Sequence, residues 1–203
     1  MTDEKTFKAR MVKVALQTLP EFGVFSAAIA IMVLDVLVLK CACSETGLME
    51  WCQFAAIMMA GCVMLAAAIR DKEGRAGVLL ASAFFFDMAI REQDWLCDKL
   101  FHGCWVVPVA IITVLVLLNA WRRREEALKG LEALGKSPDF GELMIAILII
   151  IGFSRMLGYK AIWRELTDGP YLPLAKRFVE EASELLGYLL VLNWTVKWFC
   201  RRR

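Results

Sequence analysis

Long apolar blocks alternate with short charged segments along the whole chain. Several of these blocks approach the roughly 20 residues that an α-helix needs to cross a bilayer. The polar segments between them run for at most about 20–30 residues, which is too short for a separate soluble domain. The pattern therefore predicts an all-α protein, a polytopic membrane helix bundle with six transmembrane helices in one domain, residues 1–203. The expected spans cover approximately residues 22–39, 50–69, 76–96, 104–121, 140–157 and 182–199.

The composition agrees with this pattern. Of all residues, 59% are hydrophobic, whereas a soluble domain is roughly 45–50% apolar. The net charge of +2 is too small to indicate a nucleic-acid partner. Residues 1–22 contain acids and no short apolar region with a small-residue cleavage site, unlike a signal peptide. We expect the first span to act as its own membrane anchor and membrane lipids to be the immediate partners.

Lysine and arginine are distributed unequally between the two sides that six spans would define. If both termini are cytoplasmic, the inner segments hold 15 of these residues and the outer segments hold 7. The positive-inside rule then favours cytoplasmic N and C termini, and we expect an inner-membrane location. Residues 122–135 lie in an inner loop and have the pattern of a short amphipathic helix. We expect this helix to lie on anionic headgroups, with binding of a protein partner as the alternative.

Ionisable residues concentrate in the outer half of the expected spans, close to the periplasmic face. Asp87, Arg91, Asp94 and Asp98 follow helical spacing and would form one stripe. In one interpretation these residues are solvated ion pairs that only hold helices in register, with Arg91 paired to Asp87 or Asp94. In the other they face a shared polar pocket, because charges inside a membrane usually face a bundle interior or a water-filled cavity.

The pocket interpretation yields a set of candidate site residues. The candidate catalytic residues are Glu92, Glu181 and Glu184, and the candidate ligand-binding residues are Glu50, Gln53, Asp87, Arg91, Asp94 and Tyr188. Such carboxylates could bind a hard divalent cation or act as a general acid and base. Arginine could instead hold an anionic headgroup while the acids accept an amine or hydroxyl. Arg155 is expected to pair with a glutamate, and Glu180 is expected to be a solvated edge residue. The metal stays open, and the single histidine, His102, argues against haem or a poly-His zinc site.

Cysteines form a second group of interest. Five of the seven map to the outer side of the expected topology, namely Cys41, Cys43, Cys52, Cys97 and Cys104. A periplasmic location would permit disulfides, and Cys97 and Cys104 flank a short loop that one could close. Cys41 and Cys43 could form a redox pair, and free cysteines that pack within spans are a further alternative.

Three short segments carry a resemblance to other proteins. Residues 45–53, 91–94 and 180–184 resemble a pattern in small uncharacterised six-span bacterial inner-membrane proteins, which implies the bacterial inner membrane but no particular activity. In plan the chain is also similar to the alkaline ceramidase superfamily of membrane hydrolases, which have seven spans and a zinc ion held by histidines. This chain lacks both those histidines and a seventh span, so the resemblance does not imply a zinc mechanism.

These observations lead to one leading functional hypothesis and two alternatives. The leading hypothesis is recognition or processing of a lipid-linked or small cationic ligand near the periplasmic face, and whether the protein is an enzyme stays open. The first alternative is a small transporter or channel subunit in which the acids form a cation path. The second is a structural partner of a membrane complex, or a homo-oligomer, in which the ion pairs only hold helices together.

Overall fold

The computed structural model describes residues 2–41, 47–167 and 172–202, and these residues contain no strand. The protein is all-helical, with 85% helix, as the sequence predicts. Two short π-helical turns, η1 (Leu34–Val38) and η2 (Ile149–Phe153), interrupt the α-helices. The α-helices are α1 (Thr2–Val33), α2 (Leu48–Arg70), α3 (Arg75–Glu92), α4 (Asp94–Cys97), α5 (Val106–Arg122), α6 (Arg124–Gly135), α7 (Phe140–Leu148), α8 (Ser154–Leu157), α9 (Lys160–Leu166) and α10 (Pro173–Arg201).

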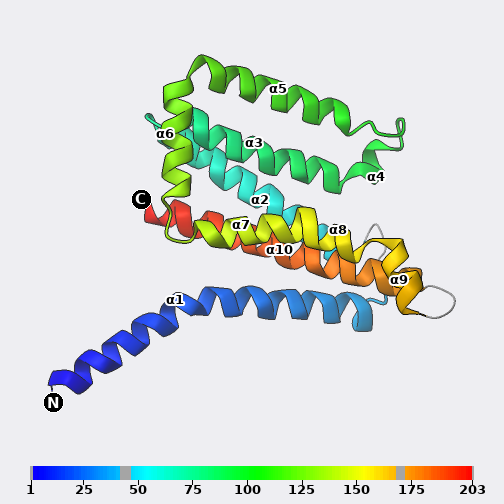
Figure 1. Ribbon diagram of the computed structural model, residues 1–203, viewed down its shortest axis with the longest axis horizontal. Helices are drawn as coiled ribbons and strands as arrows, with labels where there is room; N and C mark the ends of the chain where they lie inside the picture. The colour runs from blue at the N-terminus through cyan, green and yellow to red at the C-terminus, as the bar shows by residue number, and fades with distance from the viewer. Residues whose placement is uncertain (1, 42–46, 168–171, 203) are drawn as a thin grey trace.

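The long helices run along a common axis (Figure 1). α2 packs against both α3 and α10, α5 packs on α3, and α1 and α7 pack on α10. α6 lies across one end of the bundle, and α4 and α9 lie at the other end (Figure 1). Both chain termini lie on the α6 side, and the first half of α1 projects beyond the bundle (Figure 1).

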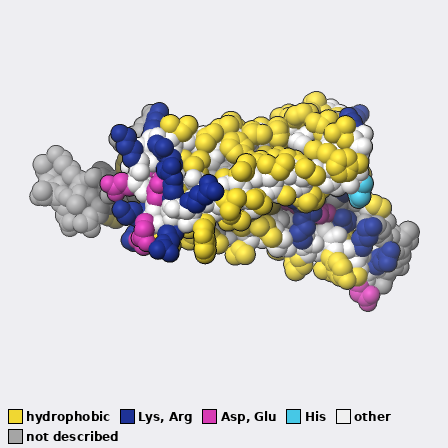
Figure 2. Space-filling view, turned by 90° about the horizontal axis from the view of Figure 1, so that it is seen from above, with side chains coloured by type: hydrophobic (Ala, Val, Ile, Leu, Met, Phe, Trp, Pro, Cys, Tyr) yellow, Lys and Arg dark blue, Asp and Glu magenta, His cyan; other side chains and the backbone are white. Residues whose placement is uncertain are grey.

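Three helical stretches are long and apolar enough to cross a membrane: Thr18–Val38, Leu48–Arg70 and Phe140–Leu157. α5 and α6 add a fourth if this pair, bent by 107°, counts as one span. No described residue of α5 is buried, and its apolar side chains are exposed instead. Apolar side chains cover the middle of the molecule, while Lys and Arg gather towards its ends (Figure 2). A surface of this kind fits a membrane protein, because soluble monomers rarely expose large continuous apolar patches.

Small residues on α2 allow its neighbours to approach closely. Ala56, Ala60 and Gly61 are fully or almost fully buried. A Cβ atom at Gly61 would lie only 2.9 Å from the Phe86 ring of α3. The Ser82 hydroxyl of α3 donates to the Gly61 carbonyl at 2.9 Å. The small residues of α2 are therefore used inside the bundle, since close backbone approach is the usual role of such residues between membrane helices.

The helix expected to lie on headgroups, α6, packs one of its faces against α3. Ala127, Gly130 and Leu134 of α6 are buried. A Cβ atom at Gly130 would come within 2.2 Å of the Gly74 carbonyl oxygen, and one at Gly77 within 2.3 Å of the Ala127 carbonyl oxygen. Because such distances are impossible for real side chains, glycine at both positions is what allows this helix crossing.

Two helices differ from their expected spans at the ends where charged residues lie. α3 ends at Glu92, because Gln93 leaves the helical region with φ −103° and ψ 30°. α10 begins at Pro173, well before the apolar run, since proline is favourable in the first turn of a helix. Hydropathy alone does not detect these ends, because α3 stops within its polar end, whereas α10 extends as helix through polar sequence.

Candidate functional site

A polar cavity of about 290 Å³ opens at the end of the bundle where α4 lies. We call it the polar cavity. It is lined by Glu50, Arg91, Glu92, Asp94, Trp95, Arg155, Lys176, Arg177, Glu180, Glu181 and Glu184. Helices α2, α3, α4, α8 and α10 all contribute to this lining, so residues far apart in the sequence meet here. Six carboxylates and four cations share the lining of this cavity.

One face of α10 supplies most of the acids. Glu181, Glu184 and Tyr188 are three and four residues apart, so they lie on the same side of the helix. Glu184 is only 3% exposed and Tyr188 is fully buried. Gly187 brings this face close to its neighbour, since a Cβ atom there would lie 2.5 Å from Ile150. Buried charge of this kind needs partners in order to be tolerated.

Arg155 is the main partner of these acids, as the sequence predicts. Its guanidinium group donates to Glu180 Oε1 at 3.1 Å through Nη1 and pairs with Glu184 through Nη2. The Ser154 hydroxyl lies 3.0 Å from Glu184 Oε1 and 2.6 Å from the Ile150 carbonyl. η2 directly precedes Ser154 and Arg155, and π-turns inside α-helices frequently occur at functional sites. The extra residue in this turn rotates both side chains relative to an unbroken helix.

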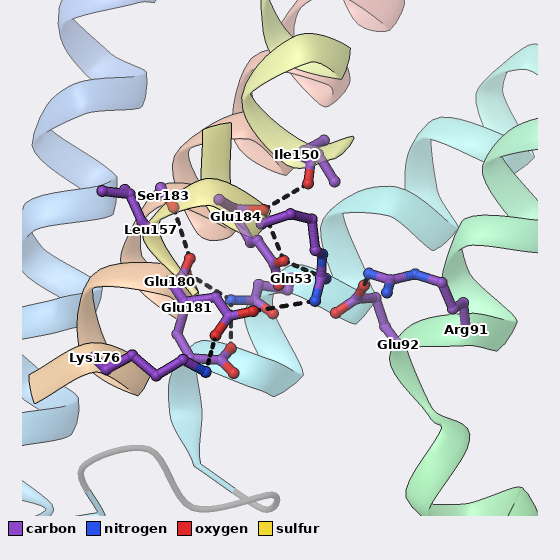
Figure 3. Close-up of polar contacts among 12 residues, drawn as sticks. Gln53, Arg91, Glu92, Ile150, Leu157, Lys176, Glu180, Glu181, Ser183 and Glu184 are labelled. Atoms are coloured by element: carbon purple, nitrogen blue, oxygen red, sulfur yellow. Dashed lines mark hydrogen bonds and ion pairs between the residues drawn. The ribbon is translucent and has the colours of Figure 1, made fainter. Parts of the chain in front are cut away.

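A second ion pair lies within α3, and a hydrogen bond from Tyr188 links it to α10. Arg91 donates to Glu92 Oε1 at 2.5 Å, and the Tyr188 hydroxyl donates to the same oxygen at 2.6 Å. Glu92 also lies within electrostatic range of Glu181 and Glu184. The carboxylates of α3 and α10 therefore belong to one cluster, with Arg91 beside Glu92 at one edge of it (Figure 3).

Gln53 of α2 completes the inner wall of this cluster. Its side chain is fully buried, and Nε2 donates to the Glu181 carbonyl at 2.9 Å and to Glu181 Oε2 at 3.2 Å. Its other side-chain atom, Oε1, is buried and has no hydrogen-bond partner in the described part of the chain. Lys176 donates to Glu180 Oε2 at 2.8 Å from the opposite side of the cluster (Figure 3). The amide and the ammonium group therefore hold the acids of α10 from two directions.

A second cavity, of about 410 Å³, adjoins the first on the side facing α5. We call it the apolar cavity, because hydrophobic side chains form most of its wall. It is lined by Phe84, Asp87, Met88, Arg91, Trp105, Val109, Ile150, Ile151 and Arg155. Arg91 and Arg155 therefore line both cavities and separate the acidic region from the apolar one.

The structure brings together eight of the nine predicted site residues and leaves one outside the acidic cluster. Seven of them line the polar cavity or bind its acids directly: Glu50, Gln53, Arg91, Glu92, Asp94, Glu181 and Glu184. Tyr188 reaches the cluster through Glu92. Asp87 lines the apolar cavity instead, where its Oδ2 accepts a hydrogen bond from Thr113 of α5 at 2.7 Å and its Oδ1 is buried without a partner in the described residues.

The predicted single stripe of charges is wrong, because the helix does not continue through it. The break at Gln93 turns Asp94 and Asp98 away from the direction of α3. Arg91 pairs with Glu92 rather than with Asp87 or Asp94.

Asp98 forms its own local contacts in the loop between α4 and α5. It accepts hydrogen bonds from the Gly103 amide at 2.8 Å and from His102 at 2.9 Å. These two donors, the Gly103 amide first, hold the pKa of Asp98 below its usual range. The histidine therefore belongs to this loop and lies outside both cavities.

The sequence pattern assigns Glu180 to a solvated edge and does not identify Lys176 or Ser154 as site residues. Glu180 instead lines the polar cavity with a side chain only 14% exposed. One feature of the sequence could have indicated Lys176 and Ser154: Arg155 is the only basic residue in the apolar span 140–157, so buried partners are required for it.

The described residues include no group of three or more His, Cys, Asp and Glu side chains arranged to hold a metal ion. Cys41, Cys52, Cys97 and Cys104 are free, and Cys43 lies outside the described residues. The Cys97 thiol lies within interaction range of Cys104, although the two are not bonded. No disulfide closes this loop in the structure, and both this disulfide and the redox pair of Cys41 and Cys43 stay predictions.

The chain was compared with known proteins at the level of family, sequence and structure. No protein family, curated protein or solved structure matches it.

Proposed function

We propose that the chain is a six-span inner-membrane protein, with both termini in the cytoplasm, that binds a lipid or lipid-linked ligand at the polar cavity. The arrangement of basic residues supports this orientation, because the α6 end carries Arg122, Arg123 and Arg124 together with the C-terminal arginines. Both termini lie on that same side, as an even number of spans requires (Figure 1). The polar cavity then lies at the periplasmic face.

The observation that carries the proposal is that Arg91 and Arg155 line both cavities. A ligand with an anionic group between the two guanidinium groups would have polar surroundings on one side and apolar surroundings on the other. This division matches a lipid, whose headgroup phosphate joins a polar part to hydrocarbon chains. The two volumes, about 290 and 410 Å³, fall within the range of ordinary ligand pockets when combined.

The acids of the cluster give the headgroup end its chemical preference. Glu92, Glu181 and Glu184 are acceptors, so they suit an amine or hydroxyl carried beyond the phosphate. The same carboxylates are the groups that would serve as general acid and base if the bound headgroup is processed. Arg91 and Arg155 would then stabilise negative charge near the reacting atoms.

Co-purified lipid is the direct test of the proposal. The protein would be purified in a mild detergent, and bound lipid would be counted by native mass spectrometry. For Arg91→Gln we expect roughly tenfold lower lipid retention, because a charge-assisted contact to phosphate is lost. Arg164→Gln is the matched control, since Arg164 is an exposed arginine on α9 and lines neither cavity. Equal retention in the Arg91 and Arg164 variants would contradict the proposed site.

A second variant distinguishes a lipid from a small cationic ligand. Val109→Phe would fill part of the apolar cavity, and Leu115→Phe adds the same ring to an exposed position of α5. A ligand with a hydrocarbon chain requires the apolar cavity, so retention should fall for the Val109 variant alone. If neither variant changes the bound mass, the ligand has no chain in this cavity.

The topology is tested separately by fusing a reporter to the C-terminus. We expect the fused reporter to be located in the cytoplasm. Activity only in the periplasm would contradict the proposed orientation.

A further inference from the structure

A third cavity, larger than the two already described, lies at the other end of the bundle, away from the proposed ligand site. It has a volume of about 730 Å³ and opens between the C-terminal ends of α2 and α10 and one side of α6. We call it the basic cavity. Lys and Arg side chains gather at this end of the molecule (Figure 2).

Two arginines of the basic cavity are held in place by aromatic rings. Arg70 lies over the Phe199 ring at 5.1 Å, and Arg202 lies over the Trp198 ring at 4.5 Å, both measured to the ring centroid. Arg202 also donates to Asp71 Oδ2 at 2.6 Å. Stacking restricts a guanidinium group to one plane while its N–H groups stay available to a ligand.

Asp71 is itself fixed by the turn in which it lies. Its Oδ1 accepts hydrogen bonds from the Gly74 amide at 2.9 Å and from the Glu73 amide at 3.1 Å. Burial alone would raise the pKa of Asp71, but these amides and Arg202 outweigh it and lower the pKa. The carboxylate therefore stays charged and keeps Arg202 in position.

The basic cavity carries a net positive charge. Lys136 is matched by Glu132 at 2.8 Å. In the part of the chain that the structure describes, neither Arg70 nor Lys129 has a carboxylate partner. The lining holds four cations and three acids in total. An anion would therefore find two free cations and one oriented arginine in a concave site.

The position of α6 indicates where such an anion comes from. Leu128 and Leu131 are 56% and 44% exposed, although the opposite face of α6 is buried against α3. A helix with an exposed apolar edge and basic neighbours is typical of the boundary between headgroups and acyl chains. Basic pockets at the cytoplasmic side of membrane helices commonly hold anionic lipid headgroups.

We propose that the basic cavity binds the phosphate group of an anionic phospholipid. Arg70 and Lys129 are its main charged contacts, and Arg202, held in place by Asp71, is a third contact. This site is independent of the polar cavity, and it would fix α6 to the ends of α2 and α10 from outside.

The test uses the full chain in nanodiscs made of phosphatidylcholine with a minor fraction of phosphatidylglycerol. Lipid that stays bound after release from the nanodisc is counted by native mass spectrometry. For the double variant Arg70→Gln with Lys129→Gln, we expect at least about tenfold lower retention of phosphatidylglycerol, because two charge-assisted contacts are lost. The control, Arg122→Gln with Arg124→Gln, removes the same charge from exposed positions at the same end that do not line the cavity. The control should retain phosphatidylglycerol at the wild-type level.

Two results would overturn the proposal. Equal loss in both double variants would mean that the surface charge, and not the cavity, attracts the lipid. Displacement by inorganic phosphate at the same concentration as the lipid would mean that the site binds free phosphate. Lys129→Gln alone serves as the check on folding, because Lys129 is exposed and its loss removes no internal contact, and it should still lower retention by a few-fold.

Discussion

Replacing Arg155 by glutamine tests whether the acids of α10 depend on one arginine. The Glu184 side chain is only 5% exposed and is paired with Arg155, whereas the arginine side chain is 45% exposed. Removing one partner of a fully buried ion pair costs about 3–5 kcal/mol, because the other charge stays buried and uncompensated. Since Arg155 is partly exposed, solvent screening reduces this figure, and we expect a loss of roughly 2 kcal/mol in the free energy of unfolding. Glu180 keeps its contact with Lys176, so the loss falls mainly on Glu184.

The free energy of unfolding would be measured by SDS-titrated unfolding in mixed micelles, followed by circular dichroism. The double variant Arg155→Gln with Glu184→Gln should recover most of the loss, because no unpaired charge remains. Arg164→Gln should stay within about 0.5 kcal/mol of wild type, as exposed substitutions usually do. If Arg155→Gln costs no more than Arg164→Gln, or if the double variant is no more stable than Arg155→Gln, the ion pair does not support the cluster as argued.

Three further predictions concern other parts of the fold. Gly130→Ala should destabilise the protein by about 1–3 kcal/mol through overpacking at the α3–α6 crossing, whereas Gly135→Ala, which has open space, should change little in the same SDS titration. Because the pKa of Asp71 is lowered in the folded protein, its contribution is present above its ordinary value of 3.8 and is lost as the pH falls through the lowered pKa. The difference in unfolding midpoint between wild type and Asp71→Asn should therefore shrink as the pH falls through that range, and a constant difference would contradict this. Oxidised glutathione should join Cys97 to Cys104 in an intramolecular disulfide, seen as the loss of two hydrogens by mass spectrometry and absent from the serine variant of either residue.

The fold class and much of the candidate site follow from hydropathy and helical spacing. Apolar blocks predict the long helices, and the three- and four-residue spacing of Glu181, Glu184 and Tyr188 correctly places them on one face. The single arginine in the apolar span 140–157 correctly predicts a glutamate partner for Arg155. These inferences succeed because they rest on the cost of unpaired charge and on local helix geometry, which a sequence contains.

Other features depend on tertiary contacts and on breaks in the helix, which local spacing does not reveal. The break at Gln93 removes Asp94 and Asp98 from the predicted stripe. Asp87 lies against Thr113 because α5 packs on that side of α3, and sequence alone does not specify this neighbour. The docking of α6 depends on Gly130, whose missing Cβ matters only once α3 is beside it.

The distribution of polar contacts along α10 favours a site open at one end over a path through the membrane. Below Tyr188, α10 buries Val191 in the apolar core. The next polar group on this helix, Asn193, donates to Glu142 Oε1 at 2.7 Å, and Lys197 donates to Glu142 Oε2 at 3.0 Å. Lys197 also pairs with Glu21 of α1. These groups of α1, α7 and α10 bind one another, so they are not arranged as successive ligands for a moving cation, which a transport path requires. A ligand held by the acids near Tyr188 would therefore enter and leave by the same face, as expected for a protein that binds or modifies a headgroup within one leaflet.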